Sequence, residues 1–356
     1  MIKSFAPGKL YIAGEYAVVT PPQPAILAAV NRFIKVSLKE AKGEGSVAAS
    51  RKQPIKWQRT KDGLITNSSD PFFTYILETI RVFEGYAKEL GIPLIYYDLE
   101  AESELETPAG VKYGLGSSAA VITATLKALS KIYELALNNE KLFKLASLVQ
   151  LGINENTSCG DLAASAYGGW LKYTKFFKAW VLRKKEDLPL PELLEKEWPG
   201  LSIEHLKEPP NLKLLVGWTG KPASSLGLVS KMKERKAADS AAFADFLSQS
   251  KECVRQMAAA FKNGDVAEIQ RQLKINRQLL LKLSNDLEME METPLLKKFS
   301  DLAEKQGGSA KFSGAGGGDC GIAVFKKADK TDDLIHKWSK IGITHLPLEV
   351  YEGADD

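Results

Sequence analysis

The chain has 356 residues, of which 44% are hydrophobic and 26% charged, as in a globular protein large enough for two domains. Its formal net charge of +4 suits anionic small molecules, but it is too small and too evenly spread to favour nucleic acid as a partner. No apolar run approaches the ~18 residues of a membrane span, and the start lacks a signal-peptide layout. We therefore expect a cytoplasmic protein with no membrane partner. The cysteines, Cys159, Cys253 and Cys320, are odd in number and far apart, which predicts neither a disulfide framework nor a cysteine zinc site.

The first forty residues predict three strands separated by two turns. Apolar strand segments cover residues 2–5, 10–12 and 25–38, with turns at Pro7-Gly8-Lys9 and at residues 13–16. Lys9 is flanked by apolar strand residues. Its side chain therefore either extends to solvent or directs its ammonium group into a cleft.

A glycine-rich loop leads directly into a predicted helix, and its sequence runs Lys112, Tyr113, Gly114, Leu115, Gly116, Ser117, Ser118, Ala119. Glycine lacks a Cβ, so this backbone can turn sharply and bring its N–H groups close to another molecule. From Ala119 onward apolar residues recur at helical spacing, which directs unpaired N–H groups and the positive end of the helix dipole toward the loop. The spacing fits neither a Walker P-loop nor the dinucleotide fingerprint. The segment predicts a phosphate site, with an ordinary strand-to-helix turn capped by serine as the alternative.

A single acid stands in a neutral segment of small residues between Asn156 and Trp170. This acid is Asp161. It either caps a short helix that ends near Ser165 or directs its carboxylate at a transferred group. The residues alone leave both interpretations open.

The charged, proline-rich residues 183–210 predict the crossing between domains, which gives an N-terminal domain of residues 1–185 and a C-terminal domain of residues 186–356. A strand at 212–216 then leads into a second loop, Gly217 to Ser225. In this loop the hydroxyls of Thr219 and Ser224 and the ammonium of Lys221 form a candidate receptor for an oxyanion. The alternative is a tight turn capped by serine.

The rest of the second domain predicts long helices and a third glycine-rich segment. Two amphipathic helices cover residues 240–262 and 266–284, with Asn276 and Arg277 on an exposed face, and another helix begins at Thr293-Pro294. The third segment, residues 311–320, contains four glycines. Each glycine costs backbone entropy on ordering, so we expect close approach to a ligand or to the first loop.

Three segments of the chain resemble, in this order, motifs of the galactokinase, homoserine kinase, mevalonate kinase and phosphomevalonate kinase (GHMP) superfamily. They are Pro7-Gly8-Lys9 with Gly14-Glu15, the segment from Gly114 to Ala120, and the segment from Lys311 to Gly318. The likeness spans nearly the whole chain, and the motifs are specific jointly although each alone is weak. Residues 112–113, 158–163 and 217–224 look most like the bacterial phosphomevalonate kinase branch.

The resemblance implies a two-domain α+β fold. Its N-terminal half is similar to domain 2 of ribosomal protein S5, its C-terminal half is ferredoxin-like, and the active site lies between them. The implied activity is ATP-dependent, Mg²⁺-assisted phosphorylation of (R)-5-phosphomevalonate to (R)-5-diphosphomevalonate with release of ADP, in the mevalonate route to isopentenyl diphosphate.

The resemblance also assigns residues. Lys9 and Asp161 match catalytic positions, and Ser118 matches a hydroxyl close to Mg²⁺. The ATP phosphates are expected to meet Lys112, Gly114, Leu115, Gly116, Ser117, Ser118 and Ala119. The acceptor is expected to meet Thr219, Lys221, Ser224, Ser313, Gly314, Ala315 and Gly316.

One position departs from the family pattern. Mevalonate kinases carry a metal-binding glutamate about eleven residues before the aspartate, and Gln150 stands there in this chain. A neutral amide is a poorer Mg²⁺ ligand than a carboxylate, so this part of the metal shell does not carry over and a mevalonate kinase is disfavoured. The alternatives are a kinase of mevalonate or another small alcohol, and a non-catalytic ATP-binding regulator.

Overall fold

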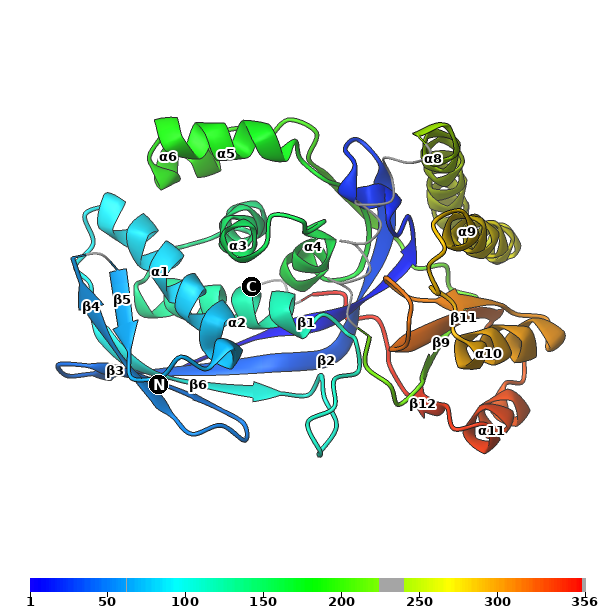
Figure 1. The fold of residues 1–356 in the computed structure, drawn as a ribbon, viewed down its shortest axis with the longest axis horizontal. Coiled ribbons are helices and arrows are strands. Elements are labelled where there is room, and N and C mark those ends of the chain that lie inside the picture. Colours follow the sequence, from blue (N-terminus) through cyan, green and yellow to red (C-terminus); the bar gives the residue numbers. More distant parts are fainter. Residues whose placement is uncertain (62, 224–239, 354–356) are drawn as a thin grey trace.

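Two β-sheets, each packed against helices, make up the fold of the computed structural model, which describes residues 1–61, 63–223 and 240–353 (Figure 1). The larger sheet belongs to the N-terminal half of the chain and the smaller sheet to the C-terminal half. No helix among these residues is long and apolar enough to cross a membrane.

Within the described residues, the larger sheet has eight strands in the order β5-β4-β3-β6-β2-β7-β8, and β1 pairs with β2 outside this path. Neighbouring strands are antiparallel except β3 and β6, which are parallel. The strands are β1 (Ile2–Ala13), β2 (Pro24–Ala41), β3 (Gly45–Ala49), β4 (Ile55–Thr60), β5 (Gly63–Thr66), β6 (Tyr96–Ser103), β7 (Trp170–Thr174) and β8 (Ser202–Leu206).

Helices cover one face of this sheet (Figure 1). Strand β6 shows why: Tyr97, Leu99 and Ala101 are buried, whereas the acidic residues between them are exposed. Such alternation gives a strand one apolar face, which the helices bury. The covering helices are α1 (Thr74–Glu89), α2 (Ser117–Ile132), α3 (Asn139–Ile153) and α4 (Gly160–Tyr167), with the 3₁₀ helix η2 (Pro71–Phe73) ahead of α1 and α5 (Lys178–Asp187) and α6 (Leu190–Glu195) farther out.

The predicted turn at Pro7-Gly8-Lys9 is wrong, because β1 is one continuous strand through these residues. Its pairing with β2 shifts by a β-bulge between Pro7 and Gly8. A Cβ on Gly8 would lie 2.8 Å from the carbonyl oxygen of Leu115, so only glycine allows this approach. The Lys9 N–H donates to that same oxygen at 2.8 Å, which joins β1 to the glycine-rich loop.

The change of sheet lies at the end of the crossing predicted for residues 183–210. The division at residues 185 and 186 falls inside α5, and β8 still pairs with β7 in the larger sheet. The chain therefore changes sheet between β8 and β9 (Leu212–Trp218). Its C-terminal end returns to the larger sheet, where the Tyr351 N–H donates to Ala29 O at 3.0 Å.

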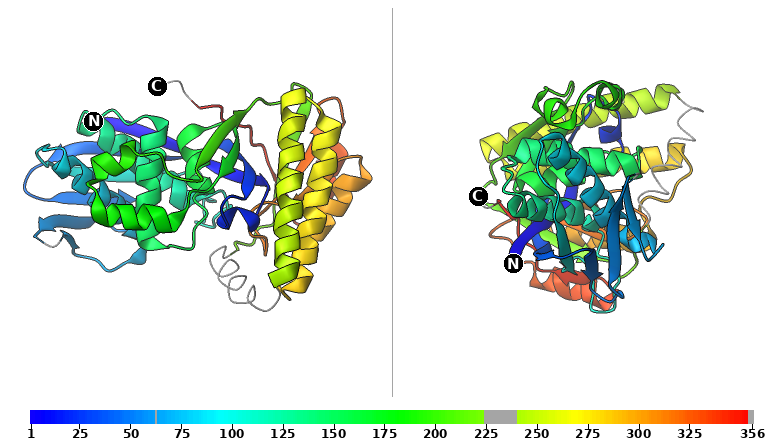
Figure 2. Two further views of the ribbon diagram at one scale, coloured as in Figure 1. Left: turned by 90° about the horizontal axis from the view of Figure 1, so that it is seen from above. Right: turned by 90° about the vertical axis from the view of Figure 1, so that its left-hand side faces the viewer.

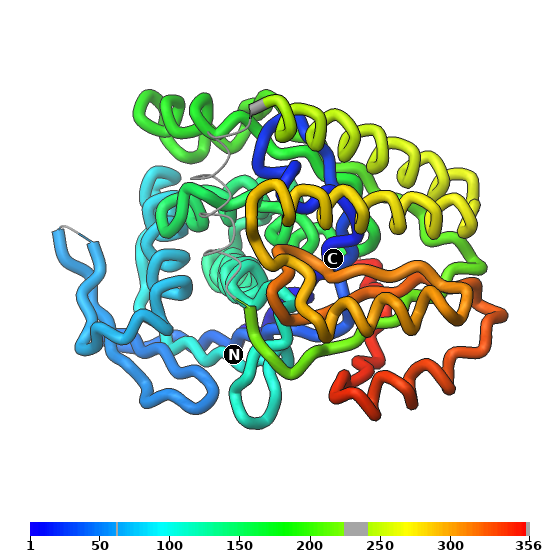
Figure 3. Tube along the Cα trace, turned by 45° about the vertical axis from the view of Figure 1, so that its right-hand side comes forward, coloured from blue at the N-terminus to red at the C-terminus, as the bar shows by residue number. Residues whose placement is uncertain are grey.

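The smaller sheet has the order β10-β11-β9-β12, and α9, α10 and α11 pack against it (Figures 1 and 3). Seen from above, α8 and α9 form an antiparallel pair along one side of the second half, and α8 also contacts β2 (Figure 2). The elements are β10 (Ser309–Phe312), β11 (Cys320–Lys326), β12 (Thr344–Leu346), α8 (Ser240–Asn263), α9 (Val266–Asp286), α10 (Pro294–Lys305) and α11 (Asp332–Lys340).

The exposed face predicted for Asn276 and Arg277 is wrong, because both residues are buried. The Arg277 guanidinium forms ion pairs with Glu292 at 2.8 Å, Asp301 at 3.2 Å and Glu304 at 2.8 Å. These carboxylates come from α10 and from the segment before it. Partners distant in sequence therefore compensate the buried charge of Arg277.

Candidate active site

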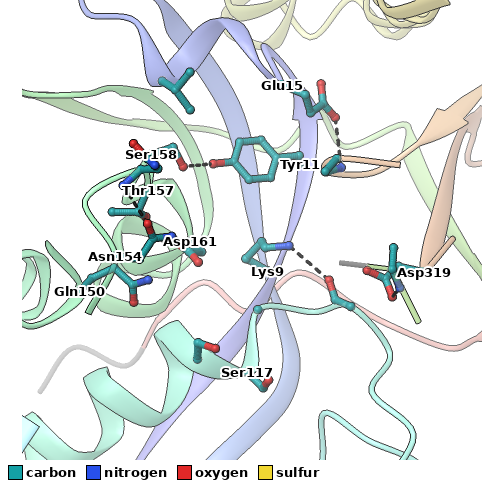
Figure 4. A pocket seen from close by; sticks show the side chains of 18 of the residues that line it. Lys9, Tyr11, Glu15, Ser117, Gln150, Asn154, Thr157, Ser158, Asp161 and Asp319 are labelled. Atoms are coloured by element: carbon teal, nitrogen blue, oxygen red, sulfur yellow. Dashed lines mark hydrogen bonds between the residues drawn. The ribbon is translucent and has the colours of Figure 1, made fainter. Parts of the chain in front are cut away.

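A cavity of about 700 Å³ lies where the N-terminal half meets the smaller sheet, and side chains from both halves line it (Figure 4). Its volume falls within the usual range for small-molecule sites. Residues from β1, the N-terminus of α2, the end of α3, the start of α4 and the third glycine-rich segment meet there. Figure 4 shows Lys9 in the middle of the site, with Asp161 and Gln150 on one side and Asp319 on the other.

The glycine-rich loop presents an uncapped helix end to this cavity. Gly116 is the N-cap of α2 with φ of 80°, and no side chain caps this end. The alternative of a turn capped by serine is therefore wrong, since Ser117 and Ser118 are the first two helical residues and line the cavity. The first amides of α2 and the positive end of its dipole thus lie where an anion can accept their hydrogen bonds.

Lys9 is held inside the site and does not extend to solvent. Its residue is 9% exposed, and its Nζ donates to the carbonyl oxygen of Gly114 at 3.2 Å (Figure 4). A Cβ on Gly116 would lie 3.0 Å from the aliphatic part of Lys9, so the loop and the lysine pack directly against each other. The ammonium group of Lys9 therefore sits beside the helix end.

Asp161 lies in the first turn of α4 and is not its N-cap. The N-cap is Cys159, and the hydroxyls of Thr157 and Ser158 accept the N–H groups of Cys159 and Gly160 at 3.1 and 3.3 Å. The Asp161 carboxylate is half-buried and faces the cavity (Figure 4). Burial raises the pKa of Asp161, and the Lys9 charge acts in the opposite direction.

The third glycine-rich segment packs against the first loop. A Cβ on Gly114 would lie 2.3 Å from the Asp319 side chain, and a Cβ on Gly316 would lie 2.1 Å from Met291 O. Asp319 Oδ1 accepts the Ala223 N–H at 3.0 Å. Burial raises the pKa of Asp319, whereas the Ala223 N–H and the charges of Lys9 and Lys112 lower it. The expected approach of these two loops is confirmed by these contacts.

The structure places some of the predicted residues on the cavity wall and others behind it. On the wall are Lys9, Lys112, Gly114, Gly116, Ser117, Ser118, Asp161, Gly314 and Ala315. Behind the wall are Leu115, Ala119, Ser313 and Gly316, which are buried. The Ser313 hydroxyl is used within the protein, since it accepts the Tyr11 N–H at 2.9 Å and donates to Tyr11 O at 3.0 Å.

The second loop is described as far as Ala223, which lines the cavity together with Pro222. Thr219 is buried, and its hydroxyl donates to Asp319 O at 3.0 Å. The Lys221 side chain is exposed and lies outside the residues that line the cavity. Ser224 lies outside the described residues. The roles of these three residues stay predictions.

Sequence reasoning assigned no role to several residues on the wall, namely Tyr11, Tyr16, Asn154, Asn156, Thr157 and Asp319. The polar run from Asn154 to Ser158, directly before Asp161, is the signal that could have indicated one side of the site. Tyr11 and Tyr16 carried no such signal, because tyrosines in and beside an apolar strand are typical of a core.

Gln150 is 5% exposed and lines the cavity from α3. Its Oε1 has no hydrogen-bond partner among the described residues. Residues 1–61, 63–223 and 240–353 contain no cluster of three acidic, histidine or cysteine side chains that could hold a metal ion. The wall thus offers a carbonyl oxygen, the Ser118 hydroxyl and the Asp161 carboxylate, but no metal cage made of protein alone.

The sequence matches the GHMP kinases N terminal domain over residues 74–169 and the GHMP kinases C terminal domain over residues 257–344. It is also 37% identical, over 96% of this chain and 95% of the relative, to a phosphomevalonate kinase of Streptomyces sp. (strain CL190). The chain belongs to the GHMP kinases.

Two solved structures are similar along nearly their whole length. One is a Lin0012 protein from Listeria innocua, with a TM-score of 0.92 and 38% identity, covering 98% of this chain and 97% of that one. The other is Streptococcus pneumoniae phosphomevalonate kinase in complex with phosphomevalonate and AMPPNP, with a TM-score of 0.87 and 31% identity, covering 98% and 100%. The predicted family and its two-domain α+β fold are confirmed.

Proposed function

We propose that this GHMP kinase transfers the γ-phosphoryl group of ATP to (R)-5-phosphomevalonate, which gives (R)-5-diphosphomevalonate and ADP. The observation that carries the proposal is the end-to-end likeness to the pneumococcal enzyme, whose structure holds phosphomevalonate and an ATP analogue. Those two ligands are both polyanions. The cavity meets that requirement with a helix N-terminus and two lysines, Lys9 and Lys112, on one wall.

In this proposal the first loop holds the ATP phosphates. The uncapped amides of α2 and the hydroxyls of Ser117 and Ser118 donate to phosphate oxygens, and Lys112 adds a positive charge at the loop's entrance. Lys9 lies between this loop and Asp161 (Figure 4). Its ammonium can therefore stabilise the negative charge that spreads over the oxygens of the transferred phosphoryl group.

The acceptor needs little help from a base. The second pKa of a phosphate monoester is about 6, so at neutral pH the attacking oxygen is largely ionised. Asp161 therefore acts mainly in positioning, by orienting Lys9 and the acceptor. Its carboxylate can also take the remaining proton from a monoanionic acceptor.

Magnesium fits this site as a companion of ATP. Mg²⁺ commonly binds through one or two protein oxygens together with substrate phosphates and water, and it does not need an all-protein cage. Ser118 and Asp161 would hold it, with the unpartnered Gln150 Oε1 as a weaker, neutral ligand, and it would neutralise phosphate charge.

The acceptor's own phosphate is assigned to the second loop. Thr219, Lys221 and Ser224 are the proposed receptor, and Gly314 and Ala315 form the adjoining wall. Ser313 and Gly316 support that wall from behind through Tyr11 and Met291.

The test is ADP release with Mg-ATP and, in separate reactions, mevalonate, 5-phosphomevalonate, 5-diphosphomevalonate, galactose and homoserine. Turnover of 5-phosphomevalonate alone is the expected result. Selective turnover of an alcohol would keep the fold and the ATP site but overturn the acceptor assignment. Tight ATP binding without turnover of any acceptor would indicate a regulator in place of an enzyme.

A further inference from the structure

The turn after β1 belongs to the N-terminal half and contacts the third glycine-rich segment, which belongs to the C-terminal half. Glu15 and Tyr16 lie between β1 and the 3₁₀ helix η1 (Ala17–Val19), and both line the cavity. A Cβ on Gly14 would lie 2.5 Å from Pro24 O, and Tyr16 has φ of 62°, so this turn has a tightly constrained backbone. From it, the Tyr16 hydroxyl donates to Ala315 O at 2.6 Å.

A buried ion pair crosses the same junction. Lys311 Nζ, on β10, contacts Glu15 Oε1, and the two side chains are 0% and 2% exposed. The same Oε1 accepts the Gly314 N–H at 3.4 Å (Figure 4). Glu15 Oε2 finds no hydrogen-bond partner among the described residues. Lys311 therefore provides the main compensation for the Glu15 charge.

The third segment depends on such outside contacts. Gly314, Gly316 and Gly317 have φ between 75° and 84°, and glycine gives this backbone more freedom than any other residue would. Contacts from Glu15 and Tyr16 fix Gly314 and Ala315 on the acceptor side of the cavity. A misplacement of about 1 Å in such a wall can cost about 100-fold in rate.

We infer that Glu15, Tyr16 and Lys311 are positioning residues, which set the acceptor wall at Gly314 and Ala315 through one hydrogen bond and one buried ion pair. The inference rests on the proposed function for the identity of the acceptor. We expect these three residues to affect acceptor affinity and turnover, whereas ATP affinity depends on the first loop.

The experiment compares Tyr16→Phe and Lys311→Met with Lys144→Met as the matched control. Lys144 is also a buried lysine, but it lies away from the cavity wall. Its Nζ donates hydrogen bonds to the carbonyl oxygens of Leu194 and Lys196 at 3.0 and 2.7 Å. We expect the KM for 5-phosphomevalonate to rise about tenfold in the first two variants, with the KM for ATP within about twofold of wild type. Lys144→Met should lower Tm and leave both KM values in place.

A charge-neutral double variant, Glu15→Gln with Lys311→Met, separates positioning from simple instability. Removing Lys311 alone leaves a buried uncompensated carboxylate, so the double variant should recover Tm relative to Lys311→Met while its acceptor KM stays raised. If Lys311→Met does not fold, Tyr16→Phe and the double variant still test the inference.

An acceptor KM within about twofold of wild type in both Tyr16→Phe and the double variant would overturn the inference. The wild-type enzyme in the same assay tests the proposed function separately. If it turns over another acceptor from the panel, the function is corrected and the same KM comparison is made with that acceptor.

Discussion

Two glycine-rich segments of similar composition use glycine for opposite purposes. The first loop ends at Gly116, where α2 begins without a side-chain cap. Ser117, Ser118 and the first amides of α2 therefore face the cavity. In the third segment the polar groups are already bound by protein, through Ser313 with Tyr11, Gly314 with Glu15, Ala315 with Tyr16, Gly317 with Met291 and Asp319 with Lys221.

The difference shows that a glycine-rich sequence can serve either close approach of a ligand or close packing of the chain against itself. In the proposed function the first loop presents donors to a ligand, whereas the third segment shapes the opposite wall. In the proposed function, Lys9 and Asp161, which come from other parts of the chain, supply the chemistry between them.

The largest effect is expected at Asp161, which belongs to neither loop. Asp161→Asn should lower kcat by about 100-fold or more, because the carboxylate charge that orients Lys9 and the acceptor is lost, with the KM for ATP within about threefold. Steady-state kinetics with varied ATP and varied acceptor measure both. Near-normal turnover would show that Asp161 has only a structural role.

The same variant carries a stability prediction with a defined sign. Burial raises the pKa of Asp161, so the folded state is penalised once the carboxylate ionises. The penalty is absent well below the usual Asp value of 3.8, grows as pH rises above it and is complete above the raised folded pKa. Asp161→Asn should therefore have an equal or higher Tm than wild type at neutral pH, and the gain should shrink toward acid. A lower Tm at neutral pH would mean that attraction to Lys9 outweighs burial.

The contact between the two segments is tested at Gly114, where a Cβ would lie 2.3 Å from the Asp319 side chain. Gly264→Ala is the matched control, since its φ of 68° is similar to the 82° of Gly114 but nothing lies within 4 Å of the added Cβ. We expect Gly114→Ala to lose about 2 kcal/mol more unfolding free energy than the control. Its kcat/KM should fall about 10- to 100-fold. Equal behaviour of the two variants would show that the contact does not matter.

A pair of serine variants tests two different roles of a hydroxyl: one available to a ligand and one hydrogen-bonded within the protein. Ser118→Ala should weaken ATP use about tenfold with little change in unfolding free energy, because its hydroxyl faces the cavity. Ser313→Ala should lose about 1–2 kcal/mol of stability and keep the KM for ATP within about twofold, because its hydroxyl bonds Tyr11. Denaturant unfolding and ATP kinetics distinguish them, and the reverse pattern would contradict the comparison.

The smallest effect is expected at the second loop. Lys221→Met should raise the KM for 5-phosphomevalonate about three- to tenfold and leave the KM for ATP unchanged, with stability within about 0.5 kcal/mol because the side chain is exposed. Lys330→Met, another exposed lysine outside the cavity wall, is the control. Equal changes in both KM values would contradict an acceptor role for Lys221.

The sequence by itself determined the family, the helix after the first loop and the set of motifs that meet in the cavity. The family followed from the resemblance of three segments to known motifs. The helix and the loops follow from local properties: glycine where the backbone must turn, apolar residues at helical spacing, and Thr293-Pro294 at the start of α10, where the Thr293 hydroxyl accepts the Leu296 N–H at 3.3 Å. Such signals act over a few residues, so they can be read without a fold.

Tertiary structure decided which of those residues face the cavity. Pro7-Gly8-Lys9 is a bulge in a strand and not a turn, because Leu115, over a hundred residues later, needs room beside Gly8. Arg277 is buried because acids from α10 and from the segment before it compensate its charge, and Ser313 turns to Tyr11 and not to the cavity. Each outcome depends on a partner distant in the chain, and local pattern carries no information about that partner.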